Sequence, residues 1–441
     1  MDSSDLAALV TGLAVQYQVP GAQLAVHHRG RTLTAETGAD AAGTGQPVSR
    51  DSAFPLGSLT KPFAAALAMT LVADEDVELD EPLLGYLPEF GAGQDVTLRQ
   101  LLSHTSGLAA NVEADAGPAA SRRRWVARHC RAEDLVHPPG TVFSYSNVGY
   151  VVVGSLVEVI TGMDWAEALE AIVLRPLGIV ASYVAGSRQP PARPVVGGHV
   201  VDAARGRILR IADQYLPAIE MPNGGLALSA ADLVTFGRLY LAAPASTGSL
   251  HRRIAAEMCR DQLAGIAVGP FGLADGWGLG WARYRDAGTT LVGHDGTGDG
   301  TSCHLRIDPG DGSVIALTTN ANTGHAMWGS LIRHLRSAGP PVERQGPAAG
   351  AGGRRPAWPQ ECLGRYVNGD AEFIISREDD GELRLSIGDQ PYSELTFDTD
   401  LRFTMRELAG HPVAHRGRFM RDNNNNRIAF LQISGRLARK C

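Results

Sequence analysis

The chain has 441 residues, which is long for one ordinary hydrophobic core and predicts two or three domains. Hydrophobic residues make up 44% and charged residues 20%, a globular composition, and the net charge of -7 argues against a nucleic-acid partner bound through a basic surface. The five cysteines are few, odd in number and without C-x-x-C spacing, which disfavours a disulfide framework and favours a reducing compartment.

The first segment predicts a helix and not an export signal. Apolar residues within 6–13 lie on one helical stripe, and Ser4 or Asp5 is the expected cap. The start is acidic, whereas a secretory signal needs a basic one, and no run of 18 apolar residues follows anywhere in the chain. We therefore expect a cytoplasmic protein without a membrane partner.

The next segments predict an α+β domain. Residues 22–38 read as a hairpin that turns at Arg29-Gly30, and a helix-rich segment follows from about 58 to 185. Further strands are expected over residues 276–284, 289–296, 300–308 and 312–320. A closing helix is expected over 326–339. Strands on both sides of a helical segment indicate one domain over 1–339, with an antiparallel sheet flanked by helices and built from both ends of the domain.

A second, smaller domain is predicted at the C-terminus. Residues 340–357 are rich in Pro, Gly and Ala, which is typical of a linker. Short β runs about ten residues apart then fill residues 358–441, and this spacing predicts a small antiparallel barrel or sandwich. The expected fold class is therefore α+β followed by a small antiparallel β-barrel domain.

The stretch PLGSLTKPFAAALAMTLV (55–72) places Ser58 and Lys61 one turn apart where a helix is predicted to begin. A serine becomes a nucleophile only when a base takes its proton, and a lysine can be that base if burial or positive charge lowers its pKa. The pair alone, however, is better explained as a serine cap beside a surface lysine.

A second motif, Tyr145-Ser146-Asn147, precedes a strongly apolar segment that predicts a helix. A tyrosine near a lysine can share proton transfer, and an asparagine can hold the lysine and donate to a substrate amide. Helix capping by Ser146 or Asn147 with packing of Tyr145 explains the same residues, and the two interpretations are compatible.

A third motif lies in VGHDGTGDGTS (292–302), at the end of a predicted strand. Gly296 would let a substrate lie close to the strand backbone. The N–H of Thr297 could complete an oxyanion hole with the N–H of Ser58. His294, Asp295 and Gly296 are therefore candidate site residues.

No metal or cofactor is expected. A phosphate loop at GTGDG is disfavoured because β runs flank it and no helix follows. A metal site at His294, Cys303 and His304 is disfavoured because neighbouring strand residues face opposite sides of a sheet.

In this order, S-x-x-K, Y-x-N and H-x-G closely resemble the penicillin-binding-protein and serine β-lactamase superfamily, in its class C-like branch. LRQLLSHTSGL (98–108) and NGGLALSAADLVTFGRLYL (223–241) are similar to connecting segments of that family, and the resemblance covers about residues 5–340. His104 in the first segment is expected to hold loop backbone. The lack of G-x-S-x-G disfavours an α/β-hydrolase.

The resemblance implies a role for each motif residue. Ser58 would be the acylated nucleophile, and Lys61 and Tyr145 would act as its base, with Tyr145 returning a proton to the leaving group. Asn147 would orient Lys61 and the substrate amide. His294 stands where β-lactamases usually have a lysine, and since a mostly neutral imidazole attracts anions weakly, binding of a β-lactam carboxylate is in doubt.

The C-terminal β domain resembles a lipocalin-like module attached to some members of the superfamily. Together with GHDGTGDGTSCHLRIDPGDG (293–312), it makes the chain most similar to the stand-alone penicillin-binding-protein-type thioesterases of nonribosomal peptide and antibiotic biosynthesis. This implies a thioesterase and peptide cyclase that accepts a peptidyl thioester with a C-terminal D-residue, free or on a peptidyl carrier protein, and releases a head-to-tail macrolactam.

Three alternatives stay open at this point. One is a cytoplasmic hydrolase of D-amino-acid peptides or small esters, and another is a trans-acting acyltransferase, since the fold implies an acyl-serine but not what attacks it. A catalytically silent binding protein is disfavoured because all three motifs are intact.

Overall fold

The computed structural model describes most of the chain. The described residues are 2–113, 121–184, 192–202, 205–211, 214–241, 249–269, 273–286, 288–338, 358–378, 381–398, 400–408, 414–422 and 425–441. The predicted linker at 340–357 lies outside them.

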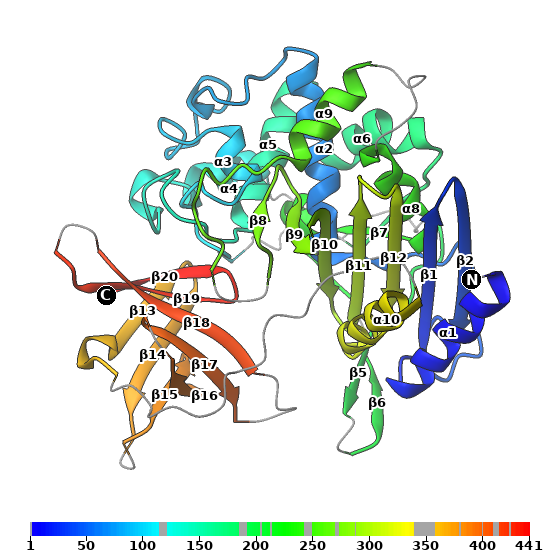
Figure 1. Cartoon of the computed structure of the whole chain (residues 1–441). Helices are drawn as coiled ribbons and strands as arrows, with labels where there is room; N and C mark the ends of the chain where they lie inside the picture. Colours follow the sequence, from blue (N-terminus) through cyan, green and yellow to red (C-terminus); the bar gives the residue numbers. More distant parts are fainter. Residues whose placement is uncertain are drawn as a thin grey trace.

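A seven-stranded antiparallel sheet is the centre of the larger part of the molecule (Figure 1). Its order, β2-β1-β12-β11-β10-β9-β8, confirms that strands from both ends of this part share one sheet. The predicted hairpin is confirmed, because His28 pairs with Arg31 across a turn in which Arg29 and Gly30 have positive φ. The strands are β1 (Gly21–His28), β2 (Arg31–Gly38), β8 (Gly276–Trp277), β9 (Ala282–Asp286), β10 (Thr289–Gly298), β11 (Thr301–Asp308) and β12 (Ser313–Thr319).

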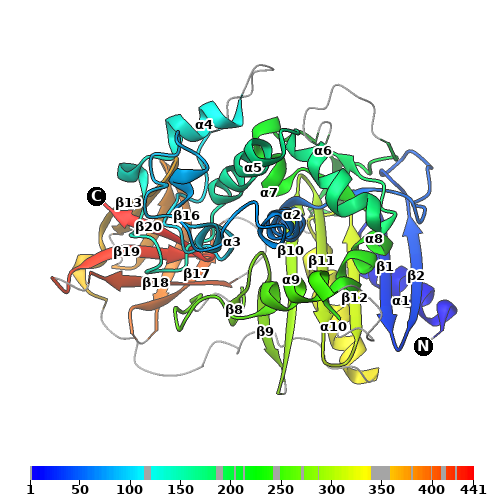
Figure 2. The same ribbon diagram turned by 90° about the horizontal axis from the view of Figure 1, so that it is seen from above.

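Helices cover both faces of this sheet (Figure 2). Helices α1 (Ser3–Gln16) and α10 (Gly324–Ala338) bury apolar side chains against one face, and α8 (Ala230–Gly237) packs on the other. The cap of α1 is Asp2, and not Ser4 or Asp5 as expected. The Asp2 carboxylate accepts the N–H groups of both these residues, and the Asp5 carboxylate accepts the Asp2 N–H in return.

The predicted helix-rich segment forms a helical region beside the sheet. Helix α2 (Lys61–Ala73) runs through its centre, and ten of its thirteen residues are buried, which explains why the segment is apolar on all sides. The other helices of this segment are α3 (Leu98–Leu102), α4 (Arg122–His129), α5 (Val148–Thr161) and α6 (Trp165–Leu169). Two helices from later in the chain, α7 (Met221–Gly224) and α9 (Ser249–Cys259), pack against α2.

Short helical turns and two small sheets connect these helices, and one further turn, η8, precedes the barrel. The turns are η1 (Gly57–Thr60), η2 (Leu83–Gly85), η3 (Ala132–Asp134), η4 (Glu170–Leu174), η5 (Arg175–Leu177), η6 (Ala218–Glu220), η7 (Arg238–Tyr240) and η8 (Gln360–Cys362). The small sheets are β3 (Phe54–Pro55) with β7 (Leu226–Leu228) and β4 (Ser182–Tyr183), and β5 (His199–Asp202) with β6 (Arg207–Arg210).

No single helix among the described residues has the length and apolar character to cross a bilayer. Two helical segments separated by a sharp bend, Val148–Thr161 and Trp165–Leu177, reach the required length and apolar composition only when they are taken together.

The C-terminal strands form a closed barrel in which each strand pairs with the next in sequence and the last with the first. Tyr366, Phe403, Phe419 and Leu431 fill its interior. Of the two predicted forms, barrel or sandwich, the structure therefore has the barrel, and the expected fold class is confirmed. The strands are β13 (Gly364–Asn368), β14 (Ala371–Arg377), β15 (Leu383–Ile387), β16 (Gln390–Phe397), β17 (Arg402–Glu407), β18 (Ala414–Arg421), β19 (Ile428–Ile433) and β20 (Arg436–Lys440).

The β19–β20 hairpin of the barrel docks on the helical region (Figure 1). The buried Gln432 amide donates to the Phe143 carbonyl over 2.9 Å, and the N–H of Tyr145 donates to the Gly435 carbonyl over 2.8 Å. The Arg439 guanidinium donates to two carbonyls of the segment before α5. The barrel is thus held against the segment that carries the Tyr-Ser-Asn motif.

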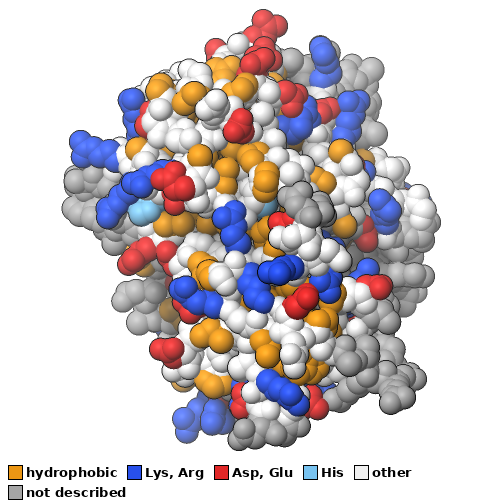
Figure 3. Space-filling model, turned by 90° about the vertical axis from the view of Figure 1, so that its left-hand side faces the viewer, with side chains coloured by type: hydrophobic (Ala, Val, Ile, Leu, Met, Phe, Trp, Pro, Cys, Tyr) orange, Lys and Arg blue, Asp and Glu red, His pale blue; other side chains and the backbone are white. Residues whose placement is uncertain are grey.

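Charges of both signs are mixed on the barrel side of the molecule. Figure 3 shows Lys and Arg interspersed with Asp and Glu and with apolar side chains on this face. Interspersed charges do not create the one-sided field by which proteins steer strongly charged partners.

Candidate active site

Ser58 and Lys61 lie together at the start of α2. Ser58 belongs to the turn η1, and Lys61 is the first residue of the helix, with its Nζ 3.2 Å from Ser58 Oγ and 2.9 Å from the Asn223 carbonyl oxygen. Lys61 is fully buried, and the helix N-cap is Thr60, whose side chain makes no capping bond. The alternative of a serine cap beside a surface lysine is therefore wrong.

The surroundings of Lys61 favour its neutral form. Burial, reinforced by the positive charge of Arg436, holds the pKa of Lys61 well below its ordinary value, and Glu220 opposes this only in part. The rings of Tyr145 and Tyr150 lie 5.0 and 5.5 Å from Nζ. A neutral amine at hydrogen-bond distance from a hydroxyl can accept its proton.

Tyr145 lies between Lys61 and the barrel. Burial raises the pKa of Tyr145 to about 12, although the Ser58 hydroxyl and Arg436 oppose the rise, so the side chain stays a phenol at neutral pH. Its hydroxyl is buried without a hydrogen bond of ordinary geometry to any described residue. A phenol in this position can relay a proton, but it is not a resident base.

His104 has the structural role expected of it. Its ring stacks on Tyr145 at 4.2 Å between centroids. Its Nδ1 accepts the N–H of Ser146 over 3.1 Å, and its carbonyl accepts the N–H of Ser144 over 2.9 Å. These bonds fix the backbone on both sides of Tyr145.

Asn147 faces the same centre from the start of α5. Its Nδ2 donates to Asn111 Oδ1 over 2.7 Å, while its Oδ1 is buried without a partner among the described residues. Among the described residues, no hydrogen bond joins Asn147 to Lys61. The carbonyl of Asn223 accepts a hydrogen bond from the lysine instead. Asn223 was not identified from the sequence, although it begins the 223–241 segment quoted above.

Strand β10 passes directly over η1. A Cβ at Gly296 would lie 1.9 Å from the Leu56 carbonyl oxygen, and one at Gly57, whose φ is +52°, would lie 2.1 Å from the Thr297 carbonyl oxygen. Both glycines are needed for this contact. Gly296 therefore makes room for protein backbone, whereas room for substrate was expected. The contact brings the Thr297 backbone beside Ser58, as an oxyanion hole from these two residues requires.

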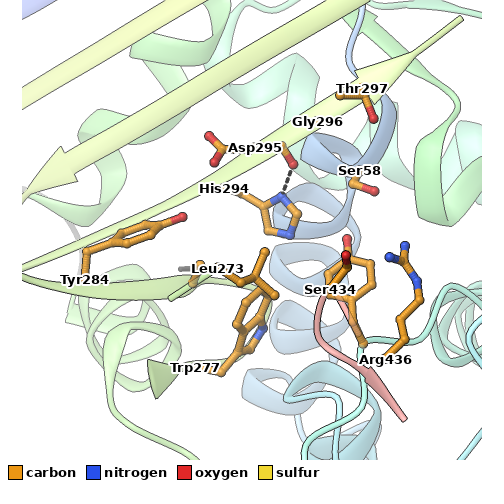
Figure 4. Close-up of a pocket in the computed structure, with 12 residues that line it drawn as sticks. Ser58, Leu273, Trp277, Tyr284, His294, Asp295, Gly296, Thr297, Ser434 and Arg436 are labelled. Atoms are coloured by element: carbon orange, nitrogen blue, oxygen red, sulfur yellow. Dashed lines mark hydrogen bonds between the residues drawn. The ribbon is translucent and has the colours of Figure 1, made fainter. Parts of the chain in front are cut away.

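His294 belongs to β10, and its side chain lies in the buried part of the site. Its Nδ1 is 2.6 Å from the Asp295 carbonyl oxygen (Figure 4), and its Nε2 has no partner among the described residues. Burial, followed by the charge of Lys61, lowers the pKa of His294 to about 3. The imidazole is therefore neutral, as the sequence predicted for this position.

Asp295 lines the same pocket, but its charge is already paired. Its carboxylate accepts two bonds from Arg306, of 2.7 and 2.9 Å, and lies 2.7 Å from His304 Nδ1. Arg306 in turn lies 4.2 Å from the Tyr284 ring. Although burial opposes them, Arg306 and His304 hold the pKa of Asp295 well below its usual range.

The barrel contributes to the site, which the sequence did not predict. In the β19–β20 turn, Ser434 and Gly435 have positive φ, and the Arg436 guanidinium lies 5.2 Å from the centre of the Tyr145 ring. Figure 4 shows Ser434 and Arg436 entering from the side opposite β10. No catalytic motif includes Ser434 or Arg436. The sequence indicates only a Ser-Gly turn between two short β runs at this place.

Two cavities meet at Ser58. The Tyr145 pocket, of about 170 Å³, is lined by Ser58, Tyr145, Leu273, Trp277, Ala282, Tyr284, His294, Asp295, Gly296, Thr297, Ser434 and Arg436. The Asn147 pocket, of about 360 Å³, is lined by Pro55, Gly57, Ser58, Asn147, Val184, Gln214, Tyr215, Leu216, Glu220, Asn223, Gly224, Thr297, Gly298 and Asp299. Within the described ranges, no three His, Cys, Asp or Glu side chains are grouped to hold a metal ion.

Known proteins share this architecture. The β-lactamase family model matches residues 6–339. Penicillin-binding protein 4 of Amycolatopsis lactamdurans is 35% identical over 331 residues, which cover 73% of this chain and 86% of that protein. Esterase EstB of Burkholderia gladioli is 31% identical, with 67% and 83% covered.

The similarity to one solved structure also includes the barrel. The crystal structure of SurE superposes with a TM-score of 0.88 at 35% identity, covering 100% of this chain and 99% of SurE. The resemblance inferred from the three motifs is thus confirmed. The chain belongs to the β-lactamase family and is an enzyme of the penicillin-binding-protein and serine β-lactamase superfamily.

Proposed function

We propose that this enzyme accepts a peptidyl thioester with a C-terminal D-residue on Ser58 and releases it as a head-to-tail macrolactam. The observation that carries the proposal is the end-to-end similarity to SurE, barrel included, together with the crystal structure of SurE with D-Leu, which superposes with a TM-score of 0.86. The reaction belongs to nonribosomal peptide and antibiotic biosynthesis in the cytoplasm, with the peptide delivered free or on a carrier protein. The five unpaired cysteines fit a reducing compartment.

Acylation uses the neutral state of Lys61. Lys61 takes the Ser58 hydroxyl proton as Oγ attacks the thioester carbonyl carbon. The backbone N–H groups of Ser58 and Thr297 receive the oxyanion. The C–S bond then breaks, and the proton passes from Lys61 through the Tyr145 hydroxyl to the departing sulfur, which leaves as a thiol.

Deacylation runs through the same groups in reverse. The N-terminal amine of the peptide attacks the acyl carbon, Lys61 and Tyr145 carry its proton back to Ser58 Oγ, and the ester C–O bond breaks as the amide forms. Arg436 disfavours a bound ammonium in the Tyr145 pocket, which keeps the entering amine neutral and nucleophilic.

Product analysis tests the cyclase. A peptidyl N-acetylcysteamine thioester with a C-terminal D-residue should give mainly cyclic product, and its L-epimer should react far more slowly. The Ser58→Ala variant is the control and should form neither product nor adduct. Linear acid as the main product, with both epimers reacting equally, would contradict the proposal.

The second candidate is a hydrolase of D-amino-acid peptides or small esters. The 31% identity to an esterase favours it, because the same acyl-serine gives an acid when water attacks. The product analysis above separates the two candidates.

A further inference from the structure

The two cavities at Ser58 carry opposite charges. In the Tyr145 pocket, Asp295 is neutralised by Arg306, so the remaining charge is that of Arg436. The Asn147 pocket contains the carboxylates of Glu220 and Asp299, and none of the described residues that line it is a lysine or an arginine. A ligand that spans Ser58 therefore meets a cationic and an anionic side.

The proton relay decides which part of a substrate enters which cavity. Tyr145 must reach both the departing thiol and the entering amine, because by microscopic reversibility the proton returns along the path by which it left. Both groups therefore occupy the Tyr145 pocket. The acyl peptide extends to the other side of Ser58, into the Asn147 pocket.

Glu220 is a half-buried carboxylate that forms no ion pair with a described residue. It ends the turn η6. Lys61 acts on Glu220 through its charge, but burial holds the pKa of Lys61 well below its ordinary value, which weakens it as a lasting counter-charge. Burial raises the pKa of Glu220, and the Asn223 amide and Lys61 oppose this rise.

Two amides in the same cavity have unused hydrogen-bonding atoms. Asn223 is 5% exposed, and its Nδ2 has no hydrogen bond of ordinary geometry among the described residues. The Oδ1 of Asn147 is also buried, and it has no hydrogen-bond partner among the described residues. Besides its contact with Glu220, the Asn223 amide can donate to a peptide carbonyl, and the unpartnered Asn147 Oδ1 can accept a peptide N–H.

We propose that the Asn147 pocket selects acyl peptides in which the residue before the reacting D-residue carries a primary ammonium side chain, with Glu220 as its counter-charge. Asn223 Nδ2 would bind the carbonyl of that residue, and Asn147 Oδ1 would bind an N–H. Asp299, exposed at the rim, extends the negative field outward. The assignment rests on the proposed function. The group bound by Glu220 is not the attacking amine, because an amine held there as an ammonium has no lone pair with which to attack the acyl carbon.

Acylation rates of matched thioesters test this selection. Two N-acetylated peptides with a C-terminal D-residue, one with lysine and one with norleucine before it, cannot cyclise through an N-terminal amine. Intact-mass spectrometry of quenched reactions follows the adduct on Ser58. We expect a lysine preference of about tenfold in kcat/KM for the wild-type enzyme, because the charge pair forms in a partly buried cavity.

Variants assign the preference to Glu220. Glu220→Gln should reduce the lysine-to-norleucine ratio to about one, Glu220→Asp should keep part of it, and Asp299→Asn should lower it by about twofold. Because each variant is compared with itself on two substrates, a general loss of folded enzyme cancels. Glu394→Gln, on the outside of the barrel, makes the same charge change and should keep the wild-type ratio.

The outcomes separate this inference from the proposed function. Equal acylation by both peptides, or a preference that survives Glu220→Gln, overturns the selection and leaves the cyclase intact. The unacetylated norleucine peptide is measured in the same assay. If it is preferred over its acetylated form as strongly as the lysine peptide is, the pocket binds the terminus and the side-chain assignment is overturned. No adduct from any peptide overturns both. A normal preference here, together with linear acid as the main product of the unacetylated thioester in the product analysis above, overturns the cyclase alone.

Discussion

The active site has two sides of different origin. Ser58, Lys61 and His294 belong to the β-lactamase fold, where a helix start and a strand place two buried basic side chains of lowered pKa beside the nucleophile. Ser434 and Arg436 belong to the barrel, where a hairpin turn brings a positive charge to the same cavity. The comparison suggests that the fold supplies the reacting groups, while the barrel sets the charge in which they react.

The two sides are joined at Tyr145. Its N–H donates to the Gly435 carbonyl, and its ring lies between Lys61 and Arg436. A change on the barrel side should therefore alter the rate and its pH dependence, whereas a change on the fold side should remove the reaction.

The largest effect is expected from Lys61→Met. Without a base for Ser58, kcat/KM should fall by about a thousandfold or more. The chain has only one other lysine, Lys440, whose Nζ lies 5.7 Å from the Tyr366 ring in the barrel. Lys440→Met is the matched control and should stay near the wild-type rate. Steady-state kinetics with a thioester substrate provide the measurement, and equal losses in both variants would refute the assignment of the base.

A smaller effect is expected from Arg436→Ala. At neutral pH, kcat/KM should fall by roughly tenfold to a hundredfold, because Lys61 loses the neighbouring cation that helps to keep it neutral. Lys61 acts only when unprotonated, so activity rises with pH through its pKa. Removing Arg436 raises that pKa, and the acidic limb of the pH–rate profile should move to higher pH.

Arg439→Ala is the matched control for that shift. Arg439 lies on the same strand, but it donates to the Leu135 and Val136 carbonyls and does not line the site. Removing the Arg439 side chain should weaken the attachment of the barrel to the helical region without shifting the acidic limb of the pH–rate profile. A limb that stays in place in Arg436→Ala, or moves equally in both variants, contradicts an electrostatic role of the barrel.

The smallest of the three effects is expected from Gln432→Ala at the docking surface. Gln432 is fully buried and donates to the Phe143 carbonyl, so its loss should lower the free energy of unfolding by about 1–3 kcal/mol. Thermal unfolding measures the change, with Gln390→Ala at an exposed strand end as control. Equal midpoints for the two variants would show that this bond does not hold the barrel in place.

The sequence predicted the fold side of the site well. Ser58, Lys61, Tyr145, Asn147 and His294 were identified because the order of their three motifs resembles the penicillin-binding-protein and serine β-lactamase superfamily. The structure brings all five around one centre. The strand spacing predicted a small barrel or a sandwich, and the pairing of β20 with β13 in the structure closes it as a barrel.

The features of the site that the sequence did not predict depend on contacts between segments that lie far apart in the chain. Arg436 meets Tyr145 across 291 positions of sequence, and no local pattern records such a contact. Gly296 was explained by substrate approach because the Leu56 backbone beneath it belongs to another element. The ion pair between Asp295 and Arg306 could not be predicted either, because each residue lies in a separate strand and no local motif links them.

The most direct test of the account is the location of the acyl group during turnover. A peptidyl thioester with a C-terminal D-residue is mixed with the enzyme, quenched before product accumulates, digested and mapped by mass spectrometry. The account predicts one adduct, on the peptide that contains Ser58, which disappears in Ser58→Ala and decays with the appearance of cyclic product. An adduct on any other residue, or one that persists in Ser58→Ala, would contradict it.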